Sequence, residues 1–316
     1  MEWLFKSRTE QDSFGKLEKK DKSLKTGKQN LNFLKRKNIN LYKVYFLFTL
    51  LELIQMGLNL SFSKKETFTR MQCYLNEITI KISGIGNQYV VNKYFYKCPD
   101  YIYLNSVLTN SIEGSCNMIN IPSEGETTNN ILLGWNDKLI SLHGMFSQFT
   151  HLLEADFSNF DGSSVTLMSD LFVNCSSITS INLSGLNTTL VETMQNTFYH
   201  CYSLIELDLS SFDTSKVTTM SFTFTGCWYL ISLNIRNFDT SQVENMEAMF
   251  AELYSLETLD VSHFDTSKVT LMSFMFYDSR KLSSLDLRNF NTSSVNNMTM
   301  MFWDDYSLRF PRCNKF

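Results

Sequence analysis

The stretch LDLSSFDTSKVTTM, residues 207–220, recurs as LDVSHFDTSKVTLM at 259–272 and as LDLRNFNTSSVNNM at 285–298. These copies follow a period of 26 residues, which holds without drift along the second half of the chain. Repeats of roughly 20–50 residues are typical of chains in which each repeat is one structural unit stacked on its neighbours. The sequence therefore predicts a stack of equivalent coils.

Three apolar columns follow this period. They are a valine column (Val165, Val191, Val217, Val243, Val269, Val295), a methionine column (Met168, Met194, Met220, Met246, Met272, Met298) and a phenylalanine column (Phe172, Phe198, Phe224, Phe250, Phe276, Phe302). Leu139, Leu142 and Phe146 occupy the same columns in a degenerate first copy. Because the i, i+3, i+7 spacing is typical of one buried helix face, we expect a short helix in each coil.

A short strand is expected before each helix. Leu207 and Leu209 alternate with polar residues, as in a strand with one buried face. Asp213 or Ser215, in the turn that follows, can accept hydrogen bonds from the free amides of a first helical turn. The predicted fold class is therefore an α/β solenoid, a leucine-rich-repeat-like right-handed stack of strand, turn and short helix, with a β-rich N-terminal cap.

The repeat unit LIELDLSSFDTSKVTTMSFTFTGCWYL, residues 204–230, resembles that of the BspA-like leucine-rich-repeat surface proteins, the type found in mycoplasma lipoproteins and protozoan surface proteins. Its elements L-D-L, F-D-T-S, V-x-x-M, M-F and C-x-x-L recur in order over residues 139–309. The resemblance implies exposure at the cell surface and adhesion or host-matrix binding. It implies no catalytic residue.

Charge divides the chain in two. Residues 1–70 carry 15 Lys/Arg and 7 Asp/Glu, whereas residues 71–316 carry 13 and 25. The acidic part lacks the clustered basic residues that replace phosphate counterions, so nucleic acid is not an expected partner. Residues 1–43 are polar and lysine-rich, which predicts a disordered basic tail.

The apolar stretch VYFLFTLLELIQMGLNL, residues 44–60, follows the basic tail. Its length and its basic flank predict a signal peptide or a signal-anchor helix that contacts the membrane and sends the rest of the chain outward. The alternative is an amphipathic helix packed on the protein. Residues 61–70 are expected to be a linker.

Residues 71–138 lack the period and predict a β-rich capping module. Its expected strands are NEITIKI (76–82), QYVVNKYFY (88–96) and DYIYLN (100–105), and its expected loops are SGIGNQ (83–88) and PSEGETTNN (122–130). The Gly84/Gly86 pair indicates a tight turn and not a phosphate cradle, because no helical pattern follows it.

The solenoid is expected over residues 139–309, followed by a short tail at 310–316. This tail is too short to form a capping module. The last coil is therefore expected to expose its core edge, which indicates either self-association through this edge or a truncated chain.

Seven cysteines occur, without the close C-x-x-C pairs of a zinc site. One column of three (Cys175, Cys201, Cys227) falls at an inward position and predicts buried thiols. The others include Cys73, Cys98 and Cys116 in the β-rich module, two of which are expected to pair if the chain is exported. Cys98 with Cys116 or with Cys73 is the preferred pair.

No catalytic, cofactor or metal site is expected. The histidines (His143, His151, His200, His263) share no metal-ligand spacing, and a Cys201–His200 dyad is disfavoured because neighbouring side chains point apart. The acidic column Asp213, Asp239 and Asp265 could be a calcium ladder, but local caps explain it better since no glycine-rich loop supplies carbonyl ligands.

Binding is expected at the outward positions of the parallel strands, because alternate side chains of a strand face solvent. The candidate partner-binding residues are Glu206, Asp208, Ser210, Asn234, Arg236, Asp260, Ser262, Asp286 and Arg288. The expected function is that of a cell-surface or secreted binding protein, membrane-anchored or released, which recognises a protein or glycan on another cell or matrix. The alternative is an intracellular protein-interaction scaffold without an anchor, and an enzyme is not expected.

Overall fold

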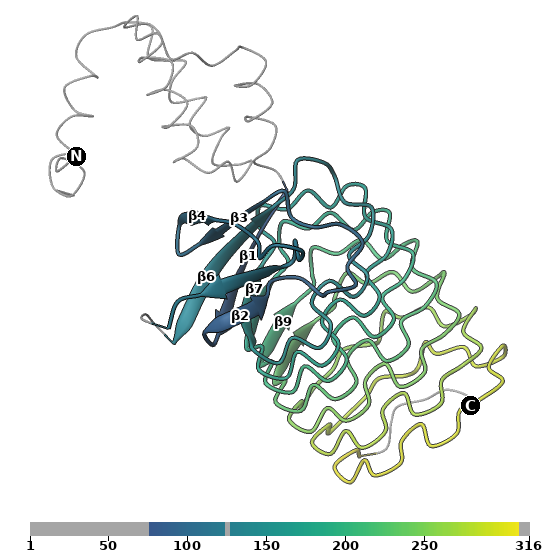
Figure 1. Ribbon diagram of the computed structural model, residues 1–316. Coiled ribbons are helices and arrows are strands. Elements are labelled where there is room, and N and C mark those ends of the chain that lie inside the picture. Colours follow the sequence, from purple (N-terminus) through teal and green to yellow (C-terminus); the bar gives the residue numbers. More distant parts are fainter. Residues whose placement is uncertain (1–75, 124–126, 310–316) are drawn as a thin grey trace, which may run out of the picture. The chain divides into compact units, whose positions relative to one another are not determined.

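The structure is a computed structural model that describes residues 76–123 and 127–309. All of them belong to the unit Phe68–Phe316. These ranges contain ten strands and no helix (Figure 1). The predictions for the basic tail, the segment 44–60, the linker, the C-terminal tail and Cys73 fall outside the described residues.

The N-terminal module is built from antiparallel strands. They are β1 (Glu77–Ser83), β2 (Gly86–Tyr89), β3 (Tyr101–Leu104), β4 (Val107–Thr109), β5 (Met118–Ile121) and β6 (Thr128–Gly134). Four of them form one sheet in the order β4-β3-β6-β1, and β2 pairs with β5. Alternating apolar residues place Ile78, Ile80 and Ile82 of β1 in the core. The strands predicted at 76–82 and 100–105 are therefore confirmed.

Three boundaries in the module differ from the prediction. The strand predicted over QYVVNKYFY ends at Tyr89, because Asn92 there binds Ser147 O and Tyr94 N and so begins a turn. Strand β2 starts inside the predicted loop 83–88, at Gly86, and β6 starts inside the predicted loop 122–130, at Thr128. The turn at Gly84 and Gly86 is confirmed, with φ of 108° and 76°, a region that L side chains rarely adopt.

The module and the repeats share one sheet. Strand β1 pairs antiparallel with β7 (Leu152–Asp156), and β7 pairs parallel with β8 (Ser180–Asn182). Farther along the stack, β9 (Glu206–Asp208) pairs parallel with β10 (Ser232–Asn234), with Leu207 opposite Leu233. Strand β1 thus covers the backbone edge of the first coil, which a parallel neighbour would otherwise occupy.

The coils follow one another at the predicted 26-residue spacing (Figure 1). A line of parallel bridges joins equivalent residues of successive coils, through Ser141, Leu167, Thr193, Thr219, Asn245, Leu271 and Asn297. After each bridge, alternate amides donate to the next coil, as in Asp170 N to Gln195 O at 3.0 Å and Phe172 N to Thr197 O at 2.9 Å. The backbone groups of each coil are therefore satisfied by its neighbours.

The predicted α/β solenoid with a short helix in each coil is wrong, because the described residues form a β-rich fold without helices. The expected helical segments are successive turns, closed by i to i+3 bonds such as Leu171 N to Met168 O and Cys175 N to Phe172 O. Asp170 lies inside the first of these turns and Asn174 inside the second, and they have φ of 59° and 57°. A left-handed residue interrupts an α-helix, so the i to i+4 bonds cannot form.

These left-handed positions recur in every coil. One column contains Gly144, Asp170, Asn196, Phe222, Ala248, Phe274 and Met300, and the other contains Gln148, Asn174, His200, Gly226, Glu252, Asp278 and Asp304. The strands of the later coils are also missing, since residues 258–260 and 284–286 are not in strands of the structure. Backbone pairing between coils has therefore replaced the expected helices, and the expected strands of the later repeats are not formed.

The predicted core columns are confirmed. The valines, methionines and phenylalanines from coil to coil are buried, except that Val295, Met298 and Phe302 of the last coil are partly exposed. Phenylalanine rings stack along the whole series, with centroids 5.7 Å apart for Phe198 and Phe224 and again for Phe224 and Phe250. Burial of this aromatic ladder is the main source of stability for a coil that has no core of its own.

Cysteines divide between the two regions. Cys98 and Cys116 form a disulfide with Cα atoms 5.7 Å apart, which resolves the two pairings left open by the sequence. Cys175, Cys201 and Cys227 are buried free thiols, as predicted. Each donates to a phenylalanine carbonyl of the preceding coil, and burial raises the pKa of all three thiols.

Candidate binding surface

The predicted partner-binding residues lie on the outward side of the strand row. Glu206, Asp208, Arg236, Asp260 and Arg288 are exposed, and Ser210, Asn234, Ser262 and Asp286 are half-buried. Several of them already have partners within the chain: Asp208 accepts from Ser210 N at 2.9 Å, and Asp260 accepts from the amide and hydroxyl of Ser262. These hydrogen bonds lower the pKa of both carboxyl groups. The acids of the row therefore close turns at the strand ends.

Aspartate and asparagine alternate at one outward position of the strand row, up to the last two coils. The residues at this position are Asp156, Asn182, Asp208, Asn234, Asp260 and Asp286. Asn182 Nδ2 donates to Asp156 Oδ1 at 3.0 Å, so an amide separates successive negative charges. Asp260 and Asp286 are acids in neighbouring coils, and there Arg288 Nη2 lies 2.6 Å from Asp286 Oδ2. Amides thus reduce the repulsion between the acids of the row, and Arg288 neutralises Asp286, so many polar groups of the row already have partners within the chain.

The acidic column at the next corner also has a local role. Asp213, Asp239 and Asp265 each accept a hydrogen bond from the amide two residues later, at 2.9–3.0 Å. They cap turns and not helices, so the predicted helix start is wrong while the local role is confirmed. No group of three His, Cys, Asp or Glu side chains placed to hold a metal ion occurs in the described ranges.

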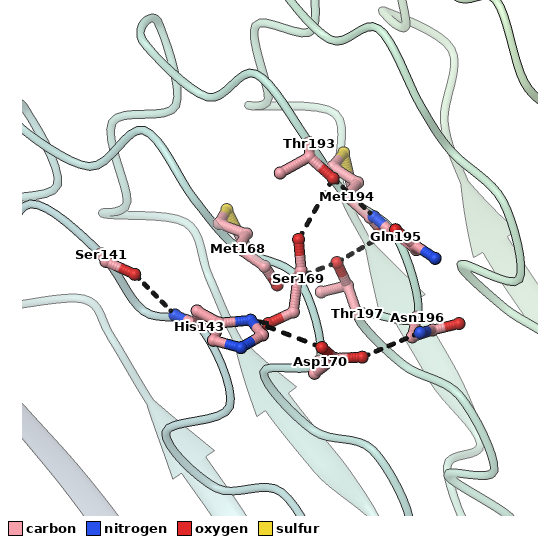
Figure 2. Close-up of polar contacts among 10 residues, drawn as sticks. All are labelled: Ser141, His143, Met168, Ser169, Asp170, Thr193, Met194, Gln195, Asn196 and Thr197. Carbon is pink, nitrogen blue, oxygen red and sulfur yellow. Dashed lines mark hydrogen bonds and ion pairs between the residues drawn. The ribbon is translucent and has the colours of Figure 1, made fainter. Parts of the chain in front are cut away.

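A polar network runs across the first coils near the bridge line (Figure 2). His143 Nδ1 lies 3.4 Å from Asp170 Oδ2, and Asn196 Nδ2 donates to Asp170 Oδ1 at 2.8 Å. Ser141 Oγ accepts from the backbone amide of His143 and does not reach its imidazole. The network therefore joins successive coils through the half-buried side chains of Asp170 and Asn196 and the exposed His143, and these bonds do not include a hydroxyl activated by a histidine.

The other histidines are spread over the molecule. His151 lies beside Tyr89 O and the ring of Phe149. His263 packs edge-on against its neighbour Phe264. His200 Nδ1 lies 3.2 Å from Asn174 Oδ1. The Cys201 thiol donates to Phe172 O instead, so these two neighbours point apart as predicted.

An aromatic column on the surface was not predicted. We define it by the side chains one residue after the cysteine column: Tyr202, Trp228, Tyr254, Arg280 and Tyr306. The ring centroids of Tyr202 and Trp228 are 4.1 Å apart, and those of Trp228 and Tyr254 are 5.6 Å apart. The guanidinium carbon of Arg280 lies 4.5 Å from the Tyr254 centroid. One aromatic stack with a cation at its end therefore crosses four coils.

Carboxylates accompany the aromatic column. Trp228 Nε1 donates to Glu252 Oε2 at 3.3 Å, and Tyr306 Oη donates to Asp304 Oδ1 at 2.8 Å. Burial raises the pKa of the Tyr254 hydroxyl to about 12, and the nearby charge of Glu252 adds to this effect. The rings and acids together form a surface that is both aromatic and negative.

Three exposed apolar side chains adjoin the aromatic column. Ile205, Tyr229 and Ile231 are 45%, 62% and 57% exposed. Ile231 N donates to Ile205 O at 2.9 Å and Tyr229 N donates to Tyr202 O at 3.2 Å, so the residues lie on adjacent coils. Contiguous exposed apolar groups of this kind mark interaction sites. We call these three residues the apolar patch.

The sequence contained a signal for the aromatic column. The letters after the cysteine column read Ser176, Tyr202, Trp228, Tyr254, Arg280 and Tyr306, a run of large residues at a position without a core role. Ile205 and Ile231 directly precede β9 and β10, and alternation would assign them to the inward side together with Leu207 and Leu233, so the strand pattern gave no signal for their exposure.

The comparisons with known proteins assign a family to this chain. A family model described as "Mycoplasma protein of unknown function, DUF285" matches residues 116–230 and 220–312, more than half of the chain. The chain belongs to this family. Neither the curated proteins nor the solved structures that were compared contain a match.

The family match covers the repeats and the last part of the N-terminal module, including β5 and β6. It therefore includes the aromatic column and the apolar patch. Among residues 76–123 and 127–309, no helix is long and apolar enough to cross a membrane.

Proposed function

We propose that this chain is a BspA-like protein displayed at the cell surface, where it binds a macromolecular partner through the outward side of its coils. The apolar patch carries the proposal. Ile205, Tyr229 and Ile231 are exposed apolar side chains on two adjacent coils, where they contribute nothing to the core. Neighbouring exposed apolar groups on a stack of paired coils suit partner recognition.

Two further observations support display outside the cytoplasm. The Cys98–Cys116 disulfide is of the kind that persists in oxidising surroundings, outside the reducing interior of a cell. The family model is that of a mycoplasma protein, which agrees with the surface-protein type that the repeat resembles. Adhesion to another cell or to a matrix is the role that we propose for this binding.

Surface labelling of intact cells tests the location. A membrane-impermeant amine reagent is expected to label Lys216 and Lys268, which are both exposed, without lysis. A cytoplasmic protein of the same cells is the control for leakage. Labelling of these lysines only after lysis would reject surface display and favour an intracellular scaffold.

A further inference from the structure

The aromatic column contains one complete cation site within the chain. Arg280 lies over the Tyr254 ring, and its Nε and Nη2 atoms donate to the two carboxylate oxygens of Asp278 at 2.6 and 2.9 Å. A guanidinium held between a ring face and a carboxylate gains both cation–π and charge-assisted hydrogen bonding. The Tyr254 ring and the Asp278 carboxylate are therefore already paired with a cation of the chain, the Arg280 guanidinium.

One coil earlier, the equivalent combination has no cation. Glu252 occupies the position of Asp278, and the ring preceding it in the column is Trp228. The Glu252 carboxylate accepts from Trp228 Nε1, and it has no Lys or Arg partner among the residues that the structure describes. Tyr254 stands where the next coil has Arg280, so the chain supplies no guanidinium here.

Glu252 is also surrounded by aromatic side chains. It is half-buried, and its charge contributes to the raised pKa of Tyr199 and Tyr202, after the larger effect of burial. The same charge opposes the lowering of the His200 pKa that burial causes. A half-buried carboxylate among rings, without a Lys or Arg partner among the described residues, offers both a charge and ring faces to a cation from outside.

The surroundings of this carboxylate favour a basic partner with apolar side chains. Trp228, which donates to Glu252, directly precedes Tyr229 in the chain, and the Tyr229 amide donates to Tyr202 O of the aromatic column. Glu206, next to Ile205, and Glu257, one period after Ile231, are exposed acids beside the patch. Opposite charge around an apolar centre guides and orients association.

We propose that Glu252, with the rings around it, is the receiving site for an arginine or lysine of a partner polypeptide, whose apolar side chains pack on Ile205, Tyr229 and Ile231. The partner is thus a basic amphipathic protein segment. This inference rests on the proposed function in that the outward side of the coils binds a macromolecule, and it names the chemistry of the partner.

Peptide binding by the purified full-length chain tests the proposal. The probe is a twelve-residue peptide of alternating arginine and leucine, and its matched control replaces each arginine by the neutral isostere citrulline. Calorimetry at physiological salt is expected to show at least tenfold weaker binding of the citrulline peptide. Failure of the arginine peptide to bind at millimolar concentration would overturn the proposal.

Two variants locate the site. Glu252→Gln removes the charge and keeps an acceptor for Trp228 Nε1, and at least tenfold weaker binding of the arginine peptide is expected. The matched control is Glu192→Gln, an exposed acid on the bridge side of a coil, which is expected to leave affinity unchanged. Ile231→Ser is expected to weaken binding several-fold. Equal losses of peptide affinity for Glu252→Gln and Glu192→Gln would show that the peptide responds only to the overall negative charge of the protein. That result would overturn the assignment of the site to Glu252.

The outcome is separable from that of surface labelling. Peptide binding is measured on purified protein, so it can succeed when display at the cell surface fails, and the reverse also holds. A glycan array provides the competing class of partner. A glycan whose binding is lost in Ile231→Ser but retained in Glu252→Gln would overturn the basic-peptide assignment in favour of a carbohydrate.

Discussion

The N-terminal module and the repeat stack satisfy their backbones in different ways. In the module, β1 lies between β6 and β7 and pairs antiparallel with both, and a disulfide links two distant loops. In the stack, short turns donate their amides to the same position of the next coil, and the thiols stay free. The module thus depends on contacts that differ from residue to residue. The stack depends on one kind of backbone hydrogen bond, which is repeated from coil to coil.

The largest expected effect is in the stack. Phe224→Ala removes a fully buried ring from the middle of the aromatic ladder and is expected to lower the free energy of unfolding by about 3–5 kcal/mol. Denaturant unfolding followed by circular dichroism measures it. Phe222→Ala is the control, since this ring two residues away is half-buried. Equal losses for both variants would show that the ladder does not dominate.

A somewhat smaller effect is expected in the module. Replacing Cys98 and Cys116 together by serine removes a crosslink over a sequence separation of 18 and is expected to cost about 3 kcal/mol. Amide hydrogen exchange should show the loss of protection first in strands β1 to β6. Reductant should reproduce it in the unaltered chain and leave the variant unchanged. Equal loosening of the distant coils would contradict the separation of the two regions.

A matched pair of alanines tests the left-handed turns of the stack. Ala248 has φ of 50° and Ala251 does not have positive φ, yet both are 3% exposed. Ala248→Gly is expected to be about 1–2 kcal/mol more stable than Ala251→Gly, because only the first relieves a left-handed backbone. Thermal unfolding of the two variants gives the difference. Equal stability would remove the left-handed turns as a source of strain.

The smallest effect is expected at the last coil, where the repeated contact changes. Burial raises the pKa of Asp305 to about 7, at a position where earlier coils have a cysteine. The folded state therefore keeps a proton that the unfolded state releases, and stability falls as the pH rises from about 4 to 7. Asp305→Asn keeps an acceptor for Ser279 N and is expected to be about 1 kcal/mol more stable at pH 8.

Unfolding midpoints across this pH range give the comparison. The gap between Asp305→Asn and the unaltered chain should narrow toward pH 4, where the folded carboxyl is protonated. Glu244→Gln is the control, since Glu244 is an exposed acid on the bridge side of an earlier coil. If the stability difference between Asp305→Asn and the unaltered chain did not change with pH, the gain in stability would come from packing and not from protonation of Asp305.

The period predicted the stacking and the core but not the backbone path. Val217, Met220 and Phe224 are buried as expected, because their spacing requires only that one side of the segment faces inward. Helices and paired turns both meet that requirement. Asp, Asn and Gly at several left-handed positions, such as Asp170 and Gly226, were a signal for turns, since these residues tolerate positive φ best.

Other residues at the same left-handed positions concealed that signal. Phe222, Glu252 and Phe274 also adopt positive φ, although their types favour other conformations. Pairing with the adjacent coils fixes them there, as in Phe222 N to Glu247 O at 2.8 Å. A contact between residues 25 positions apart outweighs a local preference and is not visible in any single repeat.

The candidate site was predicted only in part. The strand alternation correctly placed Asp208 and Asp260 outward, but it could not show that each closes a turn with its neighbouring serine. The column of Trp228 and Tyr254 depends on which way a turn directs its side chains, and periodicity alone does not give that direction. Side-chain direction in turns comes from the backbone path, which was the part predicted wrongly.

The bonds that join the coils also determine how the protein responds to a pulling force. Because they run from one coil to the next, tension along the stack loads them coil by coil. The terminal coil can then detach while the rest stays folded, and each released coil of 26 residues adds roughly 90 Å of extended chain. A molecule built this way yields in regular steps under load, which single-molecule stretching would record as evenly spaced extensions.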